Sequence, residues 1–222
     1  MMLKKQGEVS MPPKGNTYNF THSKVLRSVR DKVILTDCDG VLLDWEYHFY
    51  KWVFETHGLE QKQSIYSVAK ALEIPWKDSA LLIKEFNESE MMKKLSPLRD
   101  AVKYVRKLHE EHGYIFHIIT SQSDDPTAQA YRKENLRNVF GDVFDGFTIL
   151  KTGQNKDKVL AKWEGTECFW IEDKVANLEM GWRAGLEGIL MDHHWNGDDE
   201  LFIRVKTWKE IYNIIIGELG WY

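Results

Sequence analysis

The stretch Val33-Ile34-Leu35-Thr36-Asp37-Cys38-Asp39-Gly40-Val41-Leu42 decides how this chain folds and where its chemistry lies. It begins with a short apolar run, which is typical of a buried strand. The run ends in two aspartates separated by one residue, and the glycine after them allows a sharp turn of the backbone. Two carboxylates at a strand end predict a divalent-cation site, or a division of nucleophilic and acid/base roles. The structural alternative is a single aspartate that caps a helix or turns a loop.

The composition indicates one domain, or one domain with a substantial insertion. The chain has 222 residues, 43 % of them hydrophobic, which is enough for a core. Its net charge of −4 argues against a broad basic face for nucleic acid. We find no signal peptide and no apolar run of membrane-spanning length. Neither Cys38 nor Cys168 fits a disulfide framework, so we expect a cytoplasmic protein without a membrane partner.

Apolar strands alternate with segments of helical period along most of the chain. The predicted strands are 33–36, 114–120, 146–150, 168–172 and 188–191, and the predicted helices are 100–111, 126–138, 156–163 and 175–184. Such alternation predicts an α/β fold with a parallel sheet covered by helices on both faces. Ligands of such sheets bind at the carboxyl ends of the strands.

Residues 45–96 interrupt this alternation, because they contain helical stretches and no convincing strand. We expect helices over 45–56, 64–72 and 78–87, the last with Asp78 as its N-cap. An insertion directly after the first strand is predicted to form a small helical cap above the carboxyl edge of the sheet. The core domain would then comprise 24–44 and 97–222. Residues 1–23 are predicted to be a flexible N-terminal arm, with a helix at 23–30.

Three further strand ends carry polar residues suited to the same chemistry. Thr120 ends the second predicted strand, Lys156 begins the helix after the third, and Glu172-Asp173 ends the fourth. A threonine hydroxyl can hold a phosphoryl oxygen, and a lysine can neutralise phosphoryl charge. Paired acids at the end of a buried strand are costly unless they meet a cation or donors.

Each of these residues has an ordinary interpretation when it is considered alone. Thr120 could cap a turn, and Asp173 could cap the helix that follows it. Lys156 competes with Lys158 for the role of active-site lysine, and Lys151 is a more distant candidate. The functional interpretation rests on the joint occurrence of all the elements, in order, each at a strand end.

This joint pattern resembles the haloacid dehalogenase-like (HAD) superfamily of phosphohydrolases over about residues 33–191. The resemblance implies a Rossmann-like parallel sheet of strand order 5-4-1-2-3 with a C1-type cap. It also implies that Asp37 is the nucleophile, that Asp39 is the general acid/base, and that Thr120 and Lys156 hold the phosphoryl group. Mg²⁺ would be held by the carboxylates of Asp37 and Asp173 and the backbone carbonyl of Asp39, and Glu172 is counted among the residues of the metal site.

Two features depart from the family pattern. The residues before Lys156 lack the usual Gly-Lys-Pro form, which bears on the choice of lysine. Glu172-Asp173 is followed by Lys174 rather than by a small residue.

The sequence therefore predicts a Mg²⁺-dependent phosphatase that acts on a small phosphomonoester through an aspartyl-phosphate. A nucleotide is the leading candidate substrate, because the chain resembles some HAD nucleotidases around Asp173–Asn177 and Asp192–Asn196, and because the aromatic side chains of residues 45–52 could stack on a base. The simpler and favoured interpretation is that Tyr47, Tyr50 and Phe54 pack the cap.

Several questions stay open on the sequence alone. His193 and His194 follow the fifth predicted strand, and we expect them in a loop at the rim of the site rather than in a metal centre. The alternative functions are a phosphomutase, a polynucleotide-end phosphatase, or a phosphate-binding regulatory module with low turnover. The oligomeric state is not set by the sequence.

Overall fold

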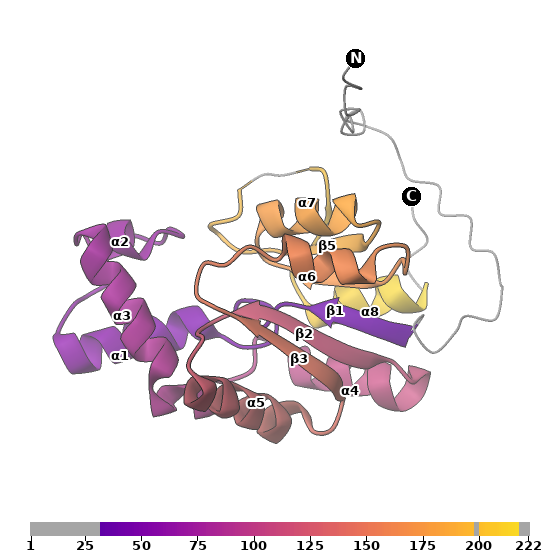
Figure 1. Cartoon of the computed structure of the whole chain (residues 1–222), viewed down its shortest axis with the longest axis horizontal. Coiled ribbons are helices and arrows are strands. Elements are labelled where there is room, and N and C mark those ends of the chain that lie inside the picture. The colour runs from indigo at the N-terminus through magenta and orange to yellow at the C-terminus, as the bar shows by residue number, and fades with distance from the viewer. Residues whose placement is uncertain (1–31, 198–199, 218–222) are drawn as a thin grey trace, which may run out of the picture.

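The computed structural model describes residues 32–197 and 200–217, and within them a parallel six-stranded sheet forms the centre of the molecule (Figure 1). Its strands are β1 (Val33–Thr36), β2 (Ile115–Ser121), β3 (Phe144–Leu150), β4 (Phe169–Glu172), β5 (Glu187–Met191) and β6 (Ile203–Val205). Their order is β3-β2-β1-β4-β5-β6. The predicted order 5-4-1-2-3 is confirmed, and β6 adds a strand beyond β5.

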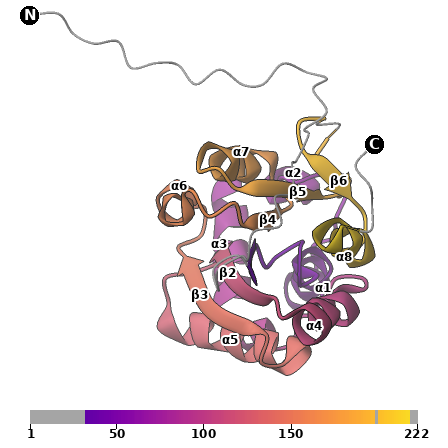
Figure 2. The same cartoon turned by 90° about the vertical axis from the view of Figure 1, so that its right-hand side faces the viewer.

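Helices cover both faces of the sheet (Figure 2). One face carries α6 (Asp157–Leu160), the 3₁₀ helix η3 (Ala161–Trp163) and α7 (Val175–Arg183), and the other carries α4 (Ala101–His112), α5 (Pro126–Phe140) and α8 (Trp208–Ile216). Each set of helices encloses its own apolar cluster against the sheet. Because both faces are covered, β1 is buried along its whole length instead of alternating between core and solvent.

A helical insertion, residues 45–96, lies between β1 and α4 in the chain and at the carboxyl end of the sheet in space (Figure 1). It contains α1 (Trp45–His57), α2 (Val68–Ala71), α3 (Trp76–Glu88) and the 3₁₀ helix η2 (Glu90–Lys93). The entering and leaving segments pair: the Asp44 N–H donates to the Ser96 carbonyl at 3.0 Å, and the Leu98 N–H donates to the Leu42 carbonyl at 2.8 Å. The insertion thus leaves and rejoins the core at one place. Its separation as a cap domain stays a prediction.

Three local predictions within these elements were wrong. The helix expected at 64–72 is only the short α2, because Ser67 accepts a hydrogen bond from the Lys70 N–H and starts the helix there. Helix α3 begins at Trp76 after Pro75, so Asp78 is not its N-cap. The helix expected at 156–163 is divided into α6 and η3.

Two further points concern the limits of the described structure. The predicted N-terminal arm and the helix at 23–30 lie outside the described residues. Among the residues that are described, every helix is too short or too polar to span a bilayer.

Candidate active site

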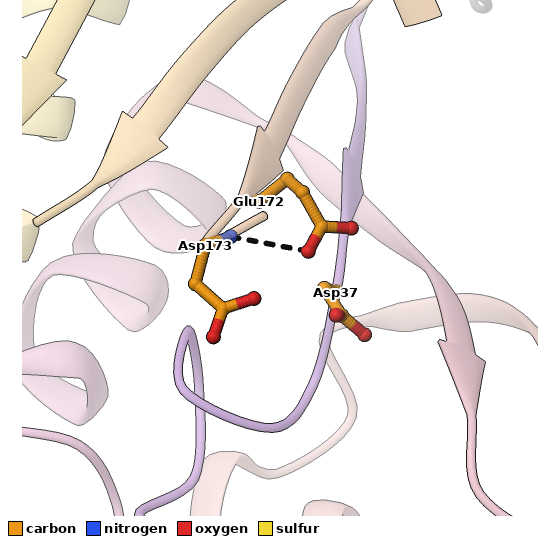
Figure 3. A group of neighbouring side chains, drawn as sticks. All are labelled: Asp37, Glu172 and Asp173. Carbon is orange, nitrogen blue, oxygen red and sulfur yellow. Dashed lines mark hydrogen bonds between the residues drawn. The ribbon is translucent and has the colours of Figure 1, made fainter. Parts of the chain in front are cut away.

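Three carboxylates converge where β1 and β4 end side by side (Figure 3). Thr36 pairs with Ile171 in the sheet, so Asp37 emerges next to Glu172 and Asp173, and the Asp37 N–H donates to the Ile171 carbonyl at 2.9 Å. All three acids are buried, and one oxygen of each lies within 4.8 Å of the others. The register of two neighbouring parallel strands therefore brings together the acids that the sequence placed at separate strand ends.

Lys156 is the lysine that enters this acidic cluster. Its Nζ lies 2.8 Å from Asp37 Oδ2 and 2.8 Å from Glu172 Oε2. The side chain is almost fully buried, whereas Lys158 and Lys151 are exposed. Burial opposes the charged form, but the two carboxylates outweigh it and raise the pKa of Lys156 above its ordinary value. The structure thus places Lys156, and neither of its competitors, against the predicted nucleophile.

Glu172 differs from its neighbour because both of its oxygens are engaged by protein donors. Oε2 accepts from Lys156 Nζ and, at 3.0 Å, from Asn177 Nδ2, while Oε1 accepts from the backbone N–H groups of Asp173 and Lys174. Such a fully bonded carboxylate stabilises the end of β4 and holds Lys156 in place. The sequence analysis assigned no role to Asn177.

Asp173 carries the unfavourable electrostatics of the site. Burial, followed by the charges of Glu172 and Asp37, raises its pKa well above the usual value. A cation beside Asp37 and Asp173 would relieve this repulsion. The donor set consists of hard carboxylate oxygens, which suits Mg²⁺.

Gly40 leaves room for Asp173 at the turn after β1. Its φ is +74°, and a Cβ added there would lie 2.4 Å from Asp173 Oδ2. The loop after β5 braces the same turn: His193 Nε2 lies 2.6 Å from the Gly40 carbonyl oxygen, and Asn196 Nδ2 donates to the Asp173 carbonyl at 3.1 Å. Burial lowers the pKa of His193 to about 4, so the neutral ring donates to Gly40 at neutral pH. The rim position expected for His193 is what the structure shows.

Asp39 is paired with an arginine that the sequence analysis did not single out. Arg132 lies on α5, and its Nη1 and Nη2 contact Asp39 Oδ1 at 2.6 Å and Oδ2 at 3.0 Å. Desolvation raises the pKa of Asp39, and the charge of Arg132 opposes that rise. A single arginine within a polar helix carries no motif, so only the three-dimensional arrangement identifies it.

Thr120 is buried near the carboxyl end of β2, the strand beside β1. It lies two residues beyond Ile118, which pairs with Thr36. Asp37 directly follows Thr36, so the threonine stands at the same edge of the sheet as the acids.

The aromatic side chains of the insertion divide into packed and exposed ones. Trp45 stacks on Phe49 with ring centroids 4.5 Å apart, and its Nε1 donates to Asn87 Oδ1 at 2.8 Å. Tyr47 and Phe54 are 57 % and 54 % exposed, so they are not the packing residues that the sequence suggested. Tyr50 packs on the core as expected, together with other members of α1 that pack on it or are buried in it: Trp45, Phe49, Trp52 and Val53.

Comparison with known proteins identifies the family. Residues 31–219 match the family model described as 5' nucleotidase, deoxy (pyrimidine), cytosolic type C protein (NT5C). The chain belongs to this family. It is therefore a phosphoric monoester hydrolase of the HAD-like superfamily, and the predicted resemblance and enzyme class are confirmed.

Individual relatives share part of the sequence or the fold with this chain. The chain is 28 % identical over 195 residues to an uncharacterised 32.4 kDa protein of Enterobacteria phage T4, a match that covers 81 % of this chain and 68 % of the phage protein. The fold of this chain is similar to that of a HAD-like hydrolase from Streptococcus pneumoniae. The TM-score is 0.58 and the identity 12 %, over 84 % of this chain and 99 % of the other. A HAD phosphatase from Thermococcus onnurineus gives a TM-score of 0.58 and 14 % identity over 84 % and 98 %. At these identities the two structures support the fold alone.

Proposed function

We propose that this member of the nucleotidase family hydrolyses a small phosphomonoester, with a nucleotide as the leading substrate, through an aspartyl-phosphate and with Mg²⁺ as cofactor. The observation that carries the proposal is the buried contact of Lys156 with Asp37 and Glu172 beside Asp173. Burying this many charges destabilises a fold unless pairing, hydrogen bonds or a ligand compensate them, and Asp173 has no cationic partner of its own among the ion pairs of the described residues. A phosphoryl group together with a divalent cation fits their signs and positions.

In the first step, an Asp37 carboxylate oxygen attacks phosphorus while the bond from phosphorus to the ester oxygen breaks. The Asp39 carboxyl gives its proton to the departing alkoxide. Asp37 is held for attack by the Cys38 N–H, which donates to Oδ1 at 2.7 Å, and by Lys156 on Oδ2. In this proposal Thr120 and Lys156 hold the phosphoryl oxygens.

In the second step, Asp39 takes a proton from a water molecule as the water oxygen attacks the phosphorus of the aspartyl-phosphate. The bond between phosphorus and Asp37 then breaks, which releases phosphate and restores both carboxyl groups. Mg²⁺, held by the Asp37 and Asp173 carboxylates and the Asp39 carbonyl, would neutralise and orient the phosphoryl group. Glu172 supports the site through Lys156 instead of serving as a main ligand, because protein donors occupy both of its oxygens.

The nucleotide assignment is supported by the family to which the chain belongs and by aromatic side chains at the rim. Tyr66 of the insertion is 59 % exposed, and its ring centroid lies 6.4 Å from that of Trp195 in the loop after β5. Lys174 Nζ lies 5.7 Å from the centroid of the Tyr66 ring, and desolvation, followed by the charges of Asp173, Glu172 and Asp37, raises the pKa of the hydroxyl to about 12. An exposed ring in that position can stack on a base as its phosphate enters the site.

The helical insertion would act as a cap in this function, because it lies over the carboxyl edge and contacts the loop after β5. His194 Nε2 lies 2.8 Å from Ser64 Oγ and 3.7 Å from Glu46 Oε1, so the two parts touch at the rim. A cytoplasmic location is part of the proposal, since the matching family is described as cytosolic and both cysteines are free.

The deciding experiment measures phosphate release from a panel of nucleoside monophosphates, sugar phosphates and p-nitrophenyl phosphate, with Mg²⁺ and with EDTA. We expect Mg²⁺-dependent hydrolysis with a nucleoside monophosphate among the best substrates. Undiminished activity in EDTA would remove the cation from the proposal. A preference for a sugar phosphate would exclude a nucleotide as the leading substrate. If none of the esters is hydrolysed, the proposed reaction itself is contradicted.

A further inference from the structure

Arg132 is a guanidinium without exposed surface that lies beside the proposed acid/base Asp39. Its side chain is 0 % exposed, and its two terminal nitrogens contact the two carboxylate oxygens of Asp39. The remaining contacts of these nitrogens are to sulfur: Cys38 Sγ at 3.3 Å and Met92 Sδ at 3.2 Å. The Nε is buried without a hydrogen-bond partner. Since an arginine buried in this way is costly unless its pairing is very good, its value lies in the contact with Asp39.

The two carboxylates of the Asp37-Cys38-Asp39 segment have separate cationic partners. Lys156 is shared between Asp37 and Glu172, whereas the ion pairs of Asp39 within the described part of the chain are all with Arg132. The Nη2–Oδ2 contact is a hydrogen bond, whereas the Nη1–Oδ1 contact is an ion pair that leaves Oδ1 without a hydrogen-bond donor among the described residues. Two approaches from one planar guanidinium fork still restrict the position and the plane of a carboxylate more than a single ammonium group does. The two acids thus differ in how firmly their orientation is imposed.

We propose that Arg132 is a positioning residue that holds the Asp39 carboxyl where it exchanges its proton with the leaving group and with water. This inference rests on the proposed function, because it assigns a role to Arg132 only through Asp39. Proton transfer depends steeply on donor–acceptor geometry. A carboxyl that rotates freely at the end of a strand would lose much of its efficiency.

A purely structural role for Arg132, anchoring α5 to the rest of the fold, is the competing explanation. Asn135, one turn further along α5, already provides such an anchor: its Nδ2 donates to the carbonyls of Lys93 and Leu95, each at 3.1 Å. Asn135 is also buried. It therefore serves as a matched control, since it is a buried polar residue of the same helix whose partners are backbone groups outside the site.

The test compares Arg132→Met with wild type on two substrates that differ in their need for an acid. One is the best nucleoside monophosphate of the panel, whose alkoxide must be protonated, and the other is p-nitrophenyl phosphate, whose leaving group needs little protonation. We expect kcat for the nucleotide to fall by about 10- to 100-fold, part of the ~10²–10⁴-fold that general acid–base catalysis contributes. The aryl phosphate should lose about threefold or less, and KM should change little for both.

The double variant supplies the second readout. In an Asp39→Asn background, Arg132→Met should cause little further loss, because residues that act through one another are not additive. Asn135→Ala should lower the melting temperature and reduce both activities by similar factors. If Arg132→Met does not fold, Arg132→Lys keeps a charge without the fork and should shift the ratio of the two activities in the same direction.

Equal losses on the two substrates, or losses that add fully to those of Asp39→Asn, would overturn the proposal for Arg132 while leaving the phosphatase intact. If the Met variant is unfolded, Arg132→Lys is measured instead. An unchanged ratio of nucleotide to aryl phosphate activity in that variant would also overturn the proposal. A wild-type protein that hydrolyses neither ester would overturn the proposed function together with this inference. The wild-type assay therefore distinguishes the two failures.

Discussion

The carboxyl edge of the sheet and the helical insertion above it are both rich in side chains that suggest chemistry, but they use them in different ways. At the edge, the buried Lys156 forms ion pairs with two buried carboxylates, those of Asp37 and Glu172. In the insertion, Trp45 and Phe49 stack on each other. The charges oppose folding unless a ligand compensates them, whereas the stacked rings favour folding by themselves.

This difference shows which sequence features are informative about function. Burial of apolar rings stabilises a fold, so a dense aromatic segment is explained by packing and needs no ligand. Burial of several carboxylates costs free energy, and packing alone does not explain it. A cluster of acids at strand ends therefore deserves a functional interpretation sooner than a cluster of aromatics does.

The largest effect is expected at the edge, from Asp37→Asn. An amide cannot form the acyl-phosphate, so turnover should fall below detection on every substrate. The change keeps the size of the side chain, and we expect the circular dichroism spectrum to stay that of wild type. Asp124→Asn is the control, because Asp124 is exposed and pairs only loosely with Lys151 at 3.7 Å. Substantial activity in a folded Asp37→Asn protein would assign the nucleophile to another residue.

The insertion gives the next largest effect, and there the comparison can be tested on two aromatic residues of different exposure. Trp45→Ala removes a packed ring and should cost about 3 kcal/mol of stability, with similar losses on nucleotide and aryl phosphate. Tyr66→Ala removes an exposed ring and should leave the melting temperature nearly unchanged. It should raise KM for the nucleotide by the equivalent of about 1–3 kcal/mol per stacked base, and affect p-nitrophenyl phosphate little.

The opposite pattern would break the comparison between packed and exposed aromatics. A raised KM for the nucleotide in Trp45→Ala, at an unchanged melting temperature, would mean that the packed ring contacts the substrate. A Tyr66→Ala protein with unchanged KM would remove Tyr66 from the rim contact and leave packing as the role of the insertion.

Much of the edge could be predicted from the sequence because parallel strands end together. Once Asp37, Thr120 and Asp173 were placed at strand ends, the sheet itself determined that they lie at one edge. The resemblance favoured Lys156, but the residue types alone did not separate it from Lys158; the structure places Lys156 in the acidic cluster and leaves Lys158 exposed. Arg132 was not predictable, since its contact with Asp39 joins residues 93 positions apart without any local signal. In the insertion, Pro75 and Ser67 determined helix starts that the apolar period alone placed incorrectly.

Metal binding should stabilise the protein through the carboxylates at the edge of the sheet and not through the insertion. A cation bound to the folded state stabilises it by about 2.7 kcal/mol at a concentration of 100 times its dissociation constant. We expect Mg²⁺ to raise the melting temperature of wild type and not that of Asp173→Asn. Without metal, Asp173→Asn should be the more stable protein, because it removes a charge whose pKa is raised by burial and by its acidic neighbours.

Two outcomes would contradict this prediction. Equal stabilisation of both proteins by Mg²⁺ would place the cation elsewhere, and a metal-free Asp173→Asn protein less stable than wild type would mean that Asp173 is not repelled by its neighbours. Ca²⁺ should also raise the melting temperature, but inhibit turnover, because its larger and more flexible coordination misplaces the attacking carboxylate.

The smallest expected effect is a pH dependence of stability from His193, which joins the edge to the loop after β5. Burial lowers its pKa to about 4 in the folded protein, against about 6.5 for an unperturbed histidine. Between these values the unfolded chain binds a proton that the folded protein does not, so this contribution to stability is complete above about pH 6.5 and is lost as the pH falls toward about 4. His193→Gln keeps a neutral donor for the Gly40 carbonyl and does not titrate. The raised pKa values of Asp39, Glu172 and Asp173 act in the opposite direction, since their protonation favours the folded state as the pH falls, but they are present in both proteins. The melting temperature at pH 7.5 minus that at pH 5 should therefore be larger in wild type than in His193→Gln. Parallel curves for the two proteins would show that the ring is not held neutral against Gly40.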